Sequence, residues 1–269
     1  MSASKGTALV TGASSGIGAI YADRLAKRGY DLILVARNEE RLKDVAQRIT
    51  SATGRSVTIL PADLNDKASL AKVESVLKEN PAITMLVNNA GFGAVGSLLQ
   101  ADVDKMEEMI DLNVTALTRL TYAAAPAFAS RGRGTIINIS SVVGIAAEML
   151  NGVYGATKAY VLALGHSLQH DLADKGIRIQ TVLPGATATE FWDIAGYPHH
   201  NMPSSIVMPA EAMVDASLVG LDNGELVTIP GLQDSDDWTK FEANRKSIST
   251  KFGNSVPAPR YGIKAARTA

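Results

Sequence analysis

Short apolar runs alternate with longer amphipathic segments from the start of the chain to about residue 230. These runs are rich in Val, Ile and Leu, and each is too short to be a helix. Apolarity that is continuous rather than alternating is typical of strands buried on both faces of a parallel sheet. The sequence therefore predicts seven strands: Ala8–Val10, Leu32–Val35, Val57–Leu60, Ile83–Val87, Thr135–Ile139, Ile177–Val182 and Leu226–Ile229.

The segments between these runs have helical character, and several of them end at a glycine that allows the chain to turn back. They are Gly16–Arg28, Glu39–Thr50, Lys67–Glu79, Val103–Phe128, Tyr154–Asp174 and Ala210–Leu221. Repeated strand–helix alternation implies right-handed crossovers between parallel strands. We therefore expect an α/β fold, a doubly wound (Rossmann) mostly parallel seven-stranded sheet with helices on both faces.

Two regions depart from this alternation, although no linker divides the chain. Residues 190–209 contain aromatic residues, prolines and two adjacent histidines without a clear period, and we expect them to form a substrate lid. Residues 231–269 form a polar C-terminal extension that ends in KAARTA, and we expect it to fray. The chain is thus interpreted as a single domain, 1–269, with a core of about 6–230.

Composition excludes several classes of protein. With 46% hydrophobic and 20% charged residues, the chain can bury a sizeable core. Its 26 basic and 27 acidic residues give no large field of one sign, which argues against nucleic acid or an anionic membrane as a partner. Cysteine is absent, so there is no disulfide or thiolate nucleophile. No signal-peptide pattern and no run of 18 apolar residues is found, and a cytoplasmic protein is expected.

A glycine-rich loop, Thr11–Gly18, follows the first predicted strand and leads into a helix. In this context Gly12 permits a tight turn, Gly16 allows a pyrophosphate to approach the backbone, and Gly18 lets the helix pack on the strand. The amide groups at the start of the helix attract phosphate oxygens. The pattern predicts a dinucleotide site formed by Gly12, Ser14, Ser15, Gly16, Ile17 and Gly18, in which the serines bond phosphate or ribose.

The end of the second predicted strand indicates which dinucleotide binds. An NAD site usually has Asp or Glu there to bond the ribose 2′-hydroxyl. This chain instead has Arg37 and Asn38. A guanidinium can pair with a 2′-phosphate, which a carboxylate would repel. NADP(H) is therefore predicted, with Arg37 as the main reader and Asn38 in support.

A possible catalytic group lies further along the chain. Tyr154 and Lys158 are four residues apart, which places them on one face of a helix. A nearby positive charge would lower the pKa of the phenol toward a useful acid–base range. Ser140 and Ser141 follow a buried strand, where open α/β sheets bind ligands, and either hydroxyl could hold a substrate carbonyl beside the tyrosine.

These motifs together resemble the short-chain dehydrogenase/reductase family in its standard-length, single-domain form, over residues 6 to about 230. The resemblance depends on the order and spacing of Thr11–Gly18, Asn88–Gly91, Asn113, Ser141, Tyr154 with Lys158, Pro184–Gly185 and Thr189. In that family the catalytic serine lies thirteen residues before the tyrosine, which selects Ser141 over Ser140.

The resemblance implies a catalytic role for four residues. Tyr154 would be the general acid in carbonyl reduction and the general base in alcohol oxidation, and Ser141 would orient the substrate oxygen. Lys158 would lower the pKa of Tyr154 and bond the nicotinamide ribose, while Asn113 would hold a water for proton relay. Further cofactor contacts are implied for Asp63 and Leu64 at the adenine, Asn89, Ala90 and Gly91 at the adenosine ribose, and Pro184, Gly185, Thr187 and Thr189 at the nicotinamide end.

The expected function is hydride transfer between NADP(H) and the carbonyl or alcohol carbon of a small molecule, as in a carbonyl reductase. The run LILVARNEERLKDVAQRI resembles a branch that acts on small ketones, hydroxy acids or alcohols, so the substrate stays open. Two alternatives are a β-ketoacyl thioester reductase and a non-catalytic NADP-sensing or scaffold protein. The family usually assembles through its two long helices, which implies a homodimer or homotetramer.

The histidines and two aromatic residues lie outside these motifs. His166 and His170 have the spacing of metal ligands but no third ligand, so no metal is predicted. His199 and His200 are interpreted as residues of a surface loop. Phe191 and Trp192 open the 190–209 segment, and the sequence supports a lid wall and a structural anchor equally for them.

Overall fold

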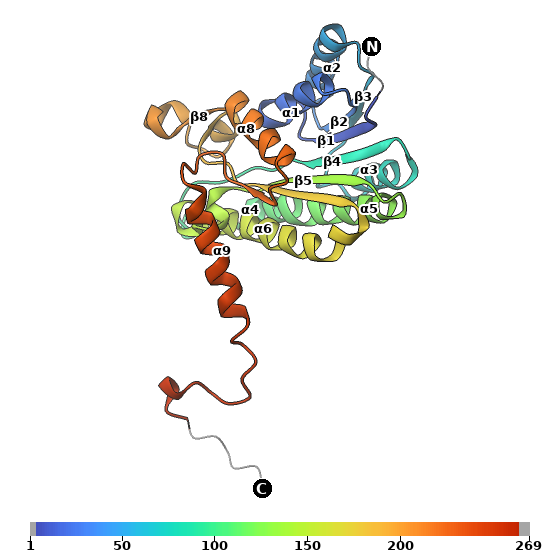
Figure 1. Cartoon of the computed structure of the whole chain (residues 1–269). Coiled ribbons are helices and arrows are strands. Elements are labelled where there is room, and N and C mark those ends of the chain that lie inside the picture. Colours follow the sequence, from blue (N-terminus) through green and yellow to red (C-terminus); the bar gives the residue numbers. More distant parts are fainter. Residues whose placement is uncertain (1–3, 264–269) are drawn as a thin grey trace. The chain divides into compact units, whose positions relative to one another are not determined.

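The computed structural model describes residues 4–263, and a seven-stranded parallel sheet forms its centre (Figure 1). The strand order is β3-β2-β1-β4-β5-β6-β9. The strands are β1 (Thr7–Thr11), β2 (Asp31–Ala36), β3 (Val57–Pro61), β4 (Ile83–Asn88), β5 (Gly134–Ile139), β6 (Ile177–Val182) and β9 (Val227–Thr228). The order reverses between β1 and β4, as in a doubly wound sheet. The predicted fold class is confirmed.

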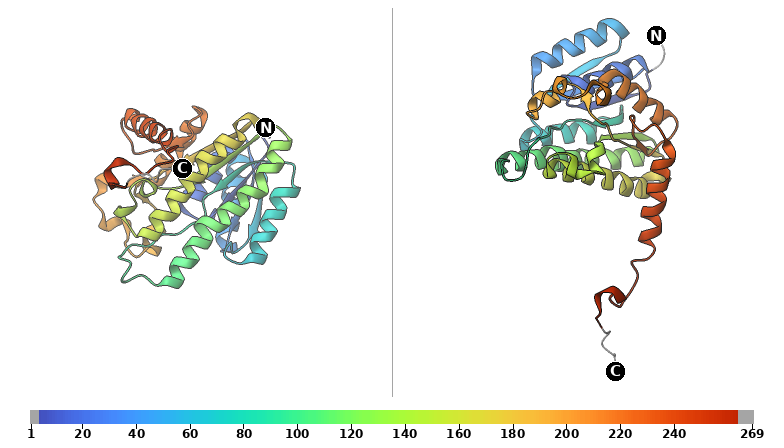
Figure 2. Two further views of the ribbon diagram at one scale, coloured as in Figure 1. Left: turned by 90° about the horizontal axis from the view of Figure 1, so that it is seen from below. Right: turned by 90° about the vertical axis from the view of Figure 1, so that its left-hand side faces the viewer.

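Helices cover both faces of this sheet (Figure 1). On one face lie α1 (Gly16–Lys27), α2 (Glu39–Thr53) and α8 (Ala210–Asp222), and on the other lie α3 (Lys67–Glu79), α4 (Val103–Ile110), α5 (Leu117–Ser130) and α6 (Gly152–Leu172). Figure 2 shows the second group side by side along the sheet. The inner strands are buried between the two layers, which explains their continuous apolarity, whereas the edge strand β3 is partly exposed.

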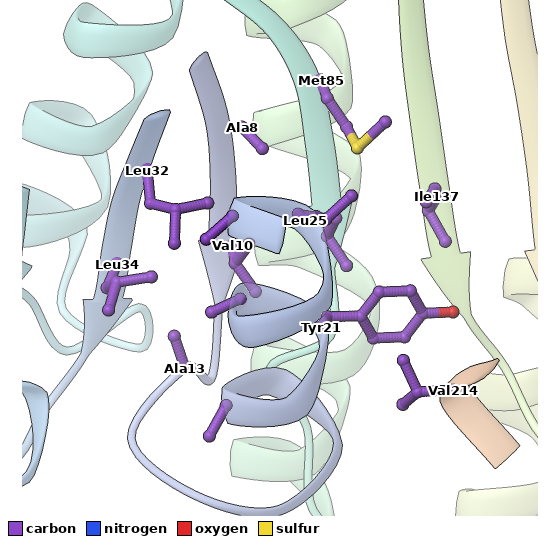
Figure 3. Close-up of a cluster of buried hydrophobic side chains, with 14 of the residues drawn as sticks. Ala8, Val10, Ala13, Tyr21, Leu25, Leu32, Leu34, Met85, Ile137 and Val214 are labelled. Atoms are coloured by element: carbon purple, nitrogen blue, oxygen red, sulfur yellow. The ribbon is translucent and has the colours of Figure 1, made fainter. Parts of the chain in front are cut away.

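Each face has its own hydrophobic core. Tyr21 and Leu25 of α1 are fully buried, and the Tyr21 ring points toward Ile137 of β5 and Val214 of α8 (Figure 3). On the other face, Phe128 of α5 and Leu77 of α3 are completely buried in a second cluster. The two cores fix the sheet between its helical layers, so the carboxyl ends of the strands form a rigid edge.

The predicted helix Val103–Phe128 is not continuous. A π-helical segment, Asp111–Ala116, separates α4 from α5. Within it Asn113 is buried, donates to the Phe92 carbonyl oxygen at 2.9 Å and accepts from the Phe92 N–H at 3.2 Å. The wider turn lets a polar side chain reach a neighbouring loop, a feature often found at functional sites. The expectation of one regular helix is therefore wrong at this point.

The segment after β6 has little regular structure. It contains a two-stranded sheet of β7 (Thr187–Ala188) and β8 (Met208–Pro209), which pair in parallel. Between them lie α7 (Phe191–Ile194) and two single turns. This small sheet fixes both ends of residues 190–209, so the segment is a tethered loop.

The described chain divides into two compact units, one up to Gly231 and one from Leu232 onward. The second unit contains α9 (Ser235–Ser249), whose N-terminus is capped by Asp234 accepting from the Asp236 N–H at 2.9 Å. The expectation that the extension frays is wrong for this part, because the capping aspartate and further acids in the first turn start a helix. The KAARTA end lies outside the described residues. None of the helices in residues 4–263 is long and apolar enough to cross a membrane.

Candidate active site

A cavity of about 760 Å³ lies at the carboxyl ends of the central strands, where open α/β sheets bind ligands. It brings together almost all of the residues predicted for the site. Those that line it are Gly12, Ser14, Ser15, Gly16, Ile17, Arg37, Asn38, Asp63, Leu64, Asn89, Ala90, Gly91, Ser141, Tyr154, Lys158, Pro184, Gly185, Thr187 and Thr189. Gly18 and Asn113 lie outside this lining.

The glycine-rich loop has no room for side chains at its key positions. Gly12 has a φ of +65°, and a Cβ on Gly18 would lie 2.3 Å from the Gly12 carbonyl oxygen. The amide of Asn89 donates to the carbonyl oxygens of Thr11 and Gly12, at 2.9 and 3.2 Å. Asn89 therefore supports the loop from the neighbouring strand end. Ser15 makes no capping hydrogen bond to α1, so the first amides of that helix are available to a phosphate group.

Two arginines stand on the cavity wall beyond β2. Arg37 is exposed there, and Arg41 lines the same wall one helical turn later. The Asn38 side chain accepts from the Arg41 N–H at 3.0 Å and caps α2, which leaves it less free to contact a cofactor. Sequence reasoning missed Arg41, although its spacing from Arg37 at the start of a helix was a signal.

Tyr154 and Lys158 lie in the same cavity, and both are buried. Burial raises the pKa of Tyr154 above its ordinary value, and a hydrogen bond with Ser141 opposes this rise. Burial lowers the pKa of Lys158 to about 8. Its ammonium nitrogen is 5.7 Å from the centre of the Tyr154 ring and donates to the Ile139 carbonyl oxygen at 2.9 Å. The largest influence on the pKa of the phenol is thus desolvation, which acts against the lowering expected from the lysine.

The two candidate serines differ in their partners. Ser140 donates to the Lys158 carbonyl oxygen at 2.7 Å and so ties β5 to α6. Ser141 is hydrogen-bonded with Tyr154, and its two other contacts, to the Pro184 carbonyl oxygen and from the Val143 N–H, are both long at 3.3 Å. The hydroxyl of Ser141 is therefore the better placed of the two to meet a ligand beside the phenol.

Asn113 lies close to Lys158, just outside the cavity lining. Besides its two bonds to Phe92 it donates to Thr157 Oγ1 at 3.2 Å, and a Cβ on Gly91 would lie 2.8 Å from its carbonyl oxygen. The same Cβ would lie 3.7 Å from the Lys158 ammonium nitrogen. Because Gly91 has no side chain, the Asn113 amide and the Lys158 ammonium group can both lie close to the backbone at this position.

Apolar side chains line the part of the cavity beyond Tyr154. The Phe191 ring is 5.7 Å from the Tyr154 ring and 5.3 Å from that of Trp192. The Trp192 indole N–H donates to the Thr187 carbonyl oxygen at 2.9 Å. Phe191 is thus a wall and Trp192 an anchor. Sequence reasoning missed other lining residues because irregular segments carry them: Phe92, Val95, Val142, Val143, Met149, Leu150, Ile194, Tyr197, Met202, Pro203 and Ile206.

The histidines take no part in this cavity. His199 and His200 lie in a single turn of the 190–209 segment, outside the lining. Across residues 4–263, no three His, Cys, Asp or Glu side chains are grouped closely enough to hold a metal ion.

Comparison with known proteins gives the class to which this fold and cavity belong. A family model described as short chain dehydrogenase matches residues 6–195, which is most of the chain. The chain belongs to the short-chain dehydrogenase/reductase family of oxidoreductases, as the motifs predicted.

Individual relatives extend this result. A short-chain dehydrogenase from Sphingobium yanoikuyae, solved in complex with NADPH, is 46% identical with a TM-score of 0.91, over 94% of this chain and 98% of that one. The bulky-bulky ketone specific alcohol dehydrogenase from Comamonas testosteroni is 42% identical with a TM-score of 0.88, over 95% and 98%. A very-long-chain 3-oxoacyl-CoA reductase of Anas platyrhynchos is 33% identical over 221 residues, 81% of this chain and 70% of that protein.

Proposed function

We propose that this protein is an NADP(H)-dependent oxidoreductase that interconverts a ketone and a secondary alcohol, with Tyr154 as the general acid and base. The observation that carries the proposal is that Tyr154, Ser141 and Lys158 line the same cavity as the glycine-rich loop and Arg37. When bound, the nicotinamide cofactor supplies the hydride chemistry, and the protein supplies position and a proton.

The protonation states of the site suit reduction. Because burial raises the pKa of Tyr154, the phenol is neutral and holds a proton to donate to the substrate oxygen. The Ser141 hydroxyl fixes that oxygen by a second hydrogen bond. Lys158, with a pKa of about 8, changes charge close to neutral pH and can return a proton toward Tyr154. Asn113, behind Lys158, orders the path to solvent. In oxidation the route runs in reverse: Tyr154 first passes its own proton toward Lys158, and the resulting phenolate accepts the proton of the alcohol.

The cofactor half of the cavity fits a dinucleotide with a 2′-phosphate. The free amides of α1 with Ser14 and Ser15 would hold the pyrophosphate, and Arg37 the 2′-phosphate. The NADPH complex of the Sphingobium relative supports this assignment. The other contacts we propose are Asp63 and Leu64 for the adenine, Asn89, Ala90 and Gly91 for its ribose, and Pro184, Gly185, Thr187 and Thr189 for the nicotinamide end.

For the substrate we propose a bulky, uncharged ketone. The side chains named above for the part of the cavity beyond Tyr154 are apolar or aromatic, whereas the two lining arginines, Arg37 and Arg41, follow β2 on the cofactor side. An apolar wall favours neutral substrates, because it offers no partner for a carboxylate or phosphate. The Comamonas relative, named for bulky-bulky ketones, supports this class. We propose that residues 190–209 act as the lid over the substrate.

A β-ketoacyl thioester is the second candidate, and the 3-oxoacyl-CoA reductase relative favours it. The test is loss of reduced-nicotinamide absorbance, with NADPH and NADH in parallel, over diaryl and branched ketones, small ketones and β-ketoacyl thioesters. Turnover with NADPH and a bulky ketone is the expected result. Faster turnover of a thioester would favour the second candidate, and cofactor binding without any turnover would favour an NADP-sensing role.

We further propose that the protein assembles as a dimer or tetramer through α4, α5 and α6. These helices carry exposed Ile110, Tyr122 and Tyr160. A groove lined almost wholly by apolar atoms lies beside them, and Leu98, Val103 and Ala156 are among its lining residues. Such patches mark protein contacts. Sedimentation that finds only monomer would contradict this assembly.

A further inference from the structure

An ion pair that the proposed chemistry does not use spans two distant parts of the cavity rim. The Arg41 guanidinium, in the first turn of α2, donates from Nη1 to Glu190 Oε2 at 2.6 Å, across 149 residues of sequence. Both residues line the cavity. Local structure does not require the contact, because Asn38 already caps α2 and Glu190 makes no capping bond to α7.

The glycine-rich loop lies between the two segments that the pair joins. On one side the Ala13 N–H donates to the Val35 carbonyl oxygen at 3.2 Å, so the loop is bonded to the end of β2. On the other side Thr189 adjoins the loop, since a Cβ on Gly16 would lie 3.3 Å from its methyl carbon. Arg41 and Glu190 follow these two contacts along the chain. Their pair therefore closes the rim above the place where a pyrophosphate would lie.

Glu190 is also directly attached to the wall of the substrate region. The next residue, Phe191, packs against Tyr154 and lies so near Gly93 that a Cβ there would be 2.5 Å from its ring. Trp192 then anchors the turn to the Thr187 carbonyl. The ion pair with Arg41 thus holds α7 at its N-cap residue, Glu190. The Trp192 indole holds the same short helix two residues later.

We propose that Arg41 and Glu190 are positioning residues that form a clasp, fastening the start of the 190–209 lid to α2 over the bound cofactor. The inference rests on the proposed NADP(H) function for its cofactor part. Both side chains are about half exposed, at 51% and 56%, so the clasp can open. An exposed pair of this kind changes a rate or affinity by about two- to fivefold.

The first test is the rate at which the cofactor leaves. Glu190→Gln removes the charge and keeps the shape. By stopped-flow fluorescence, we expect NADH to leave this variant about two- to fivefold faster than wild type, because the clasp no longer holds the lid over the cofactor. The matched control is Glu40→Gln, which breaks an exposed ion pair with Lys43 within α2. Cofactor release from this control should be unchanged. Unchanged or slower NADH release from the Glu190 variant would overturn the proposal.

Charge reversal tests the pairing itself. Arg41→Glu alone is expected to speed NADH release, and adding Glu190→Arg to restore it, because the pair is re-formed with opposite polarity. NADH is the probe because it has no 2′-phosphate for the arginine to contact. A double variant whose release rate is raised by the product of the factors measured for Arg41→Glu and Glu190→Arg alone would contradict a direct pair.

A cofactor-free measurement separates this inference from the proposed function. Hydrogen exchange of the amides in residues 190–194 is expected to be faster in Glu190→Gln than in wild type, without any ligand. Equal exchange would overturn the clasp. Failure of the wild-type protein to bind NADPH would overturn the proposed function and leave this exchange result to decide the clasp.

Discussion

The two halves of the cavity are built differently. The cofactor half consists of strand ends and backbone: the glycine loop follows β1, Arg37 follows β2, and Asn89 follows β4. The substrate half consists of side chains on irregular segments, with Phe191, Met202 and Ile206 on the 190–209 loop. The first half is fixed by the hydrogen-bond ladder of the large sheet, and the second by side-chain packing together with the short β7–β8 pairing and the Trp192–Thr187 hydrogen bond.

This difference predicts how each half tolerates change. A backbone that is hydrogen-bonded on both sides cannot move to admit an extra atom, whereas an exposed apolar side chain can be replaced at small cost. Ile206, for example, is 59% exposed, while Gly18 has no space for a methyl group. Substitutions that remove a reacting group or force the backbone of the cofactor half to move should therefore strongly reduce activity or cofactor affinity. Substitutions in the lid should mainly change substrate preference.

The largest effect is expected at the junction of the two halves. Tyr154→Phe removes the proton donor and should lower kcat by about 10²–10⁴-fold, while NADPH binding measured by fluorescence stays nearly unchanged. The control is Tyr160→Phe on the same helix, whose hydroxyl is exposed and bonded to Thr118 at 2.8 Å. Comparable losses in both variants would contradict the role given to Tyr154.

Gly18→Ala tests the rigidity of the cofactor half. The added Cβ would lie 2.3 Å from the Gly12 carbonyl oxygen, so the loop must shift. We expect NADPH affinity to fall by about 10- to 100-fold and the free energy of unfolding by about 1–3 kcal/mol. Titration calorimetry and denaturant unfolding measure the two effects. Gly152→Ala, which meets nothing within 4 Å, should leave both close to wild type.

The buried lysine gives a pH dependence of stability. The folded pKa of Lys158 is about 8, below its unfolded value, so the unfolded chain binds more protons between pH 8 and about 10.5. The free energy of unfolding should therefore gain about 2 kcal/mol from this group as the pH rises from 7.5 to 9.5. Lys158→Met should lose that gain in urea unfolding at the two pH values. An equal rise in the variant would show that other groups cause it.

Arg37→Leu tests whether the cofactor half reads the 2′-phosphate. Loss of one charge-assisted contact should reduce the preference for NADPH over NADH by about tenfold, or about 1.4 kcal/mol, with NADH affinity unchanged. Arg48→Leu, on the exposed face of the same α2 region, is the control. If Arg37→Leu lowered the affinity for NADH as much as the affinity for NADPH, Arg37 would stabilise the structure of the site and would not recognise the 2′-phosphate.

The smallest effect is expected in the lid. Ile206→Ala shortens an exposed apolar side chain at the cavity wall and should change KM for a bulky ketone by about two- to fivefold, because one or two buried methylene groups are lost. KM for a small ketone and the affinity for NADPH should stay constant. A matching change in NADPH affinity would mean that the two halves are coupled more closely than their construction implies.

Much of the cofactor half was predictable from sequence. The glycine spacing after a strand indicated the loop, and the missing acid at the tip of the second strand indicated Arg37. The seven apolar runs predicted the sheet, which the structure has. These features follow local rules: apolar periodicity, turn chemistry and the position of strand ends. The roles of the individual site residues stay predictions until they are measured.

The regions that sequence reasoning missed depend on non-local contacts. The π-helical turn around Asn113 exists because its side chain bonds the backbone of Phe92, 21 residues away. The helix α9 is an exception, because its cap at Asp234 is a local contact with the Asp236 N–H that was overlooked in a polar segment. The apolar wall beyond Tyr154 depends on the path of the irregular residues 142–150 and 190–209, which no periodicity describes.

The sequence by itself determined the order of strands and helices, the glycine-rich loop, and the spacing of Ser141, Tyr154 and Lys158. Only the tertiary structure decided that burial, not the lysine, dominates the pKa of the phenol, and that Arg41 meets Glu190 at the rim. The reason is physical: propensity and periodicity act over a few residues, whereas desolvation and ion pairing depend on which distant segments the sheet brings together.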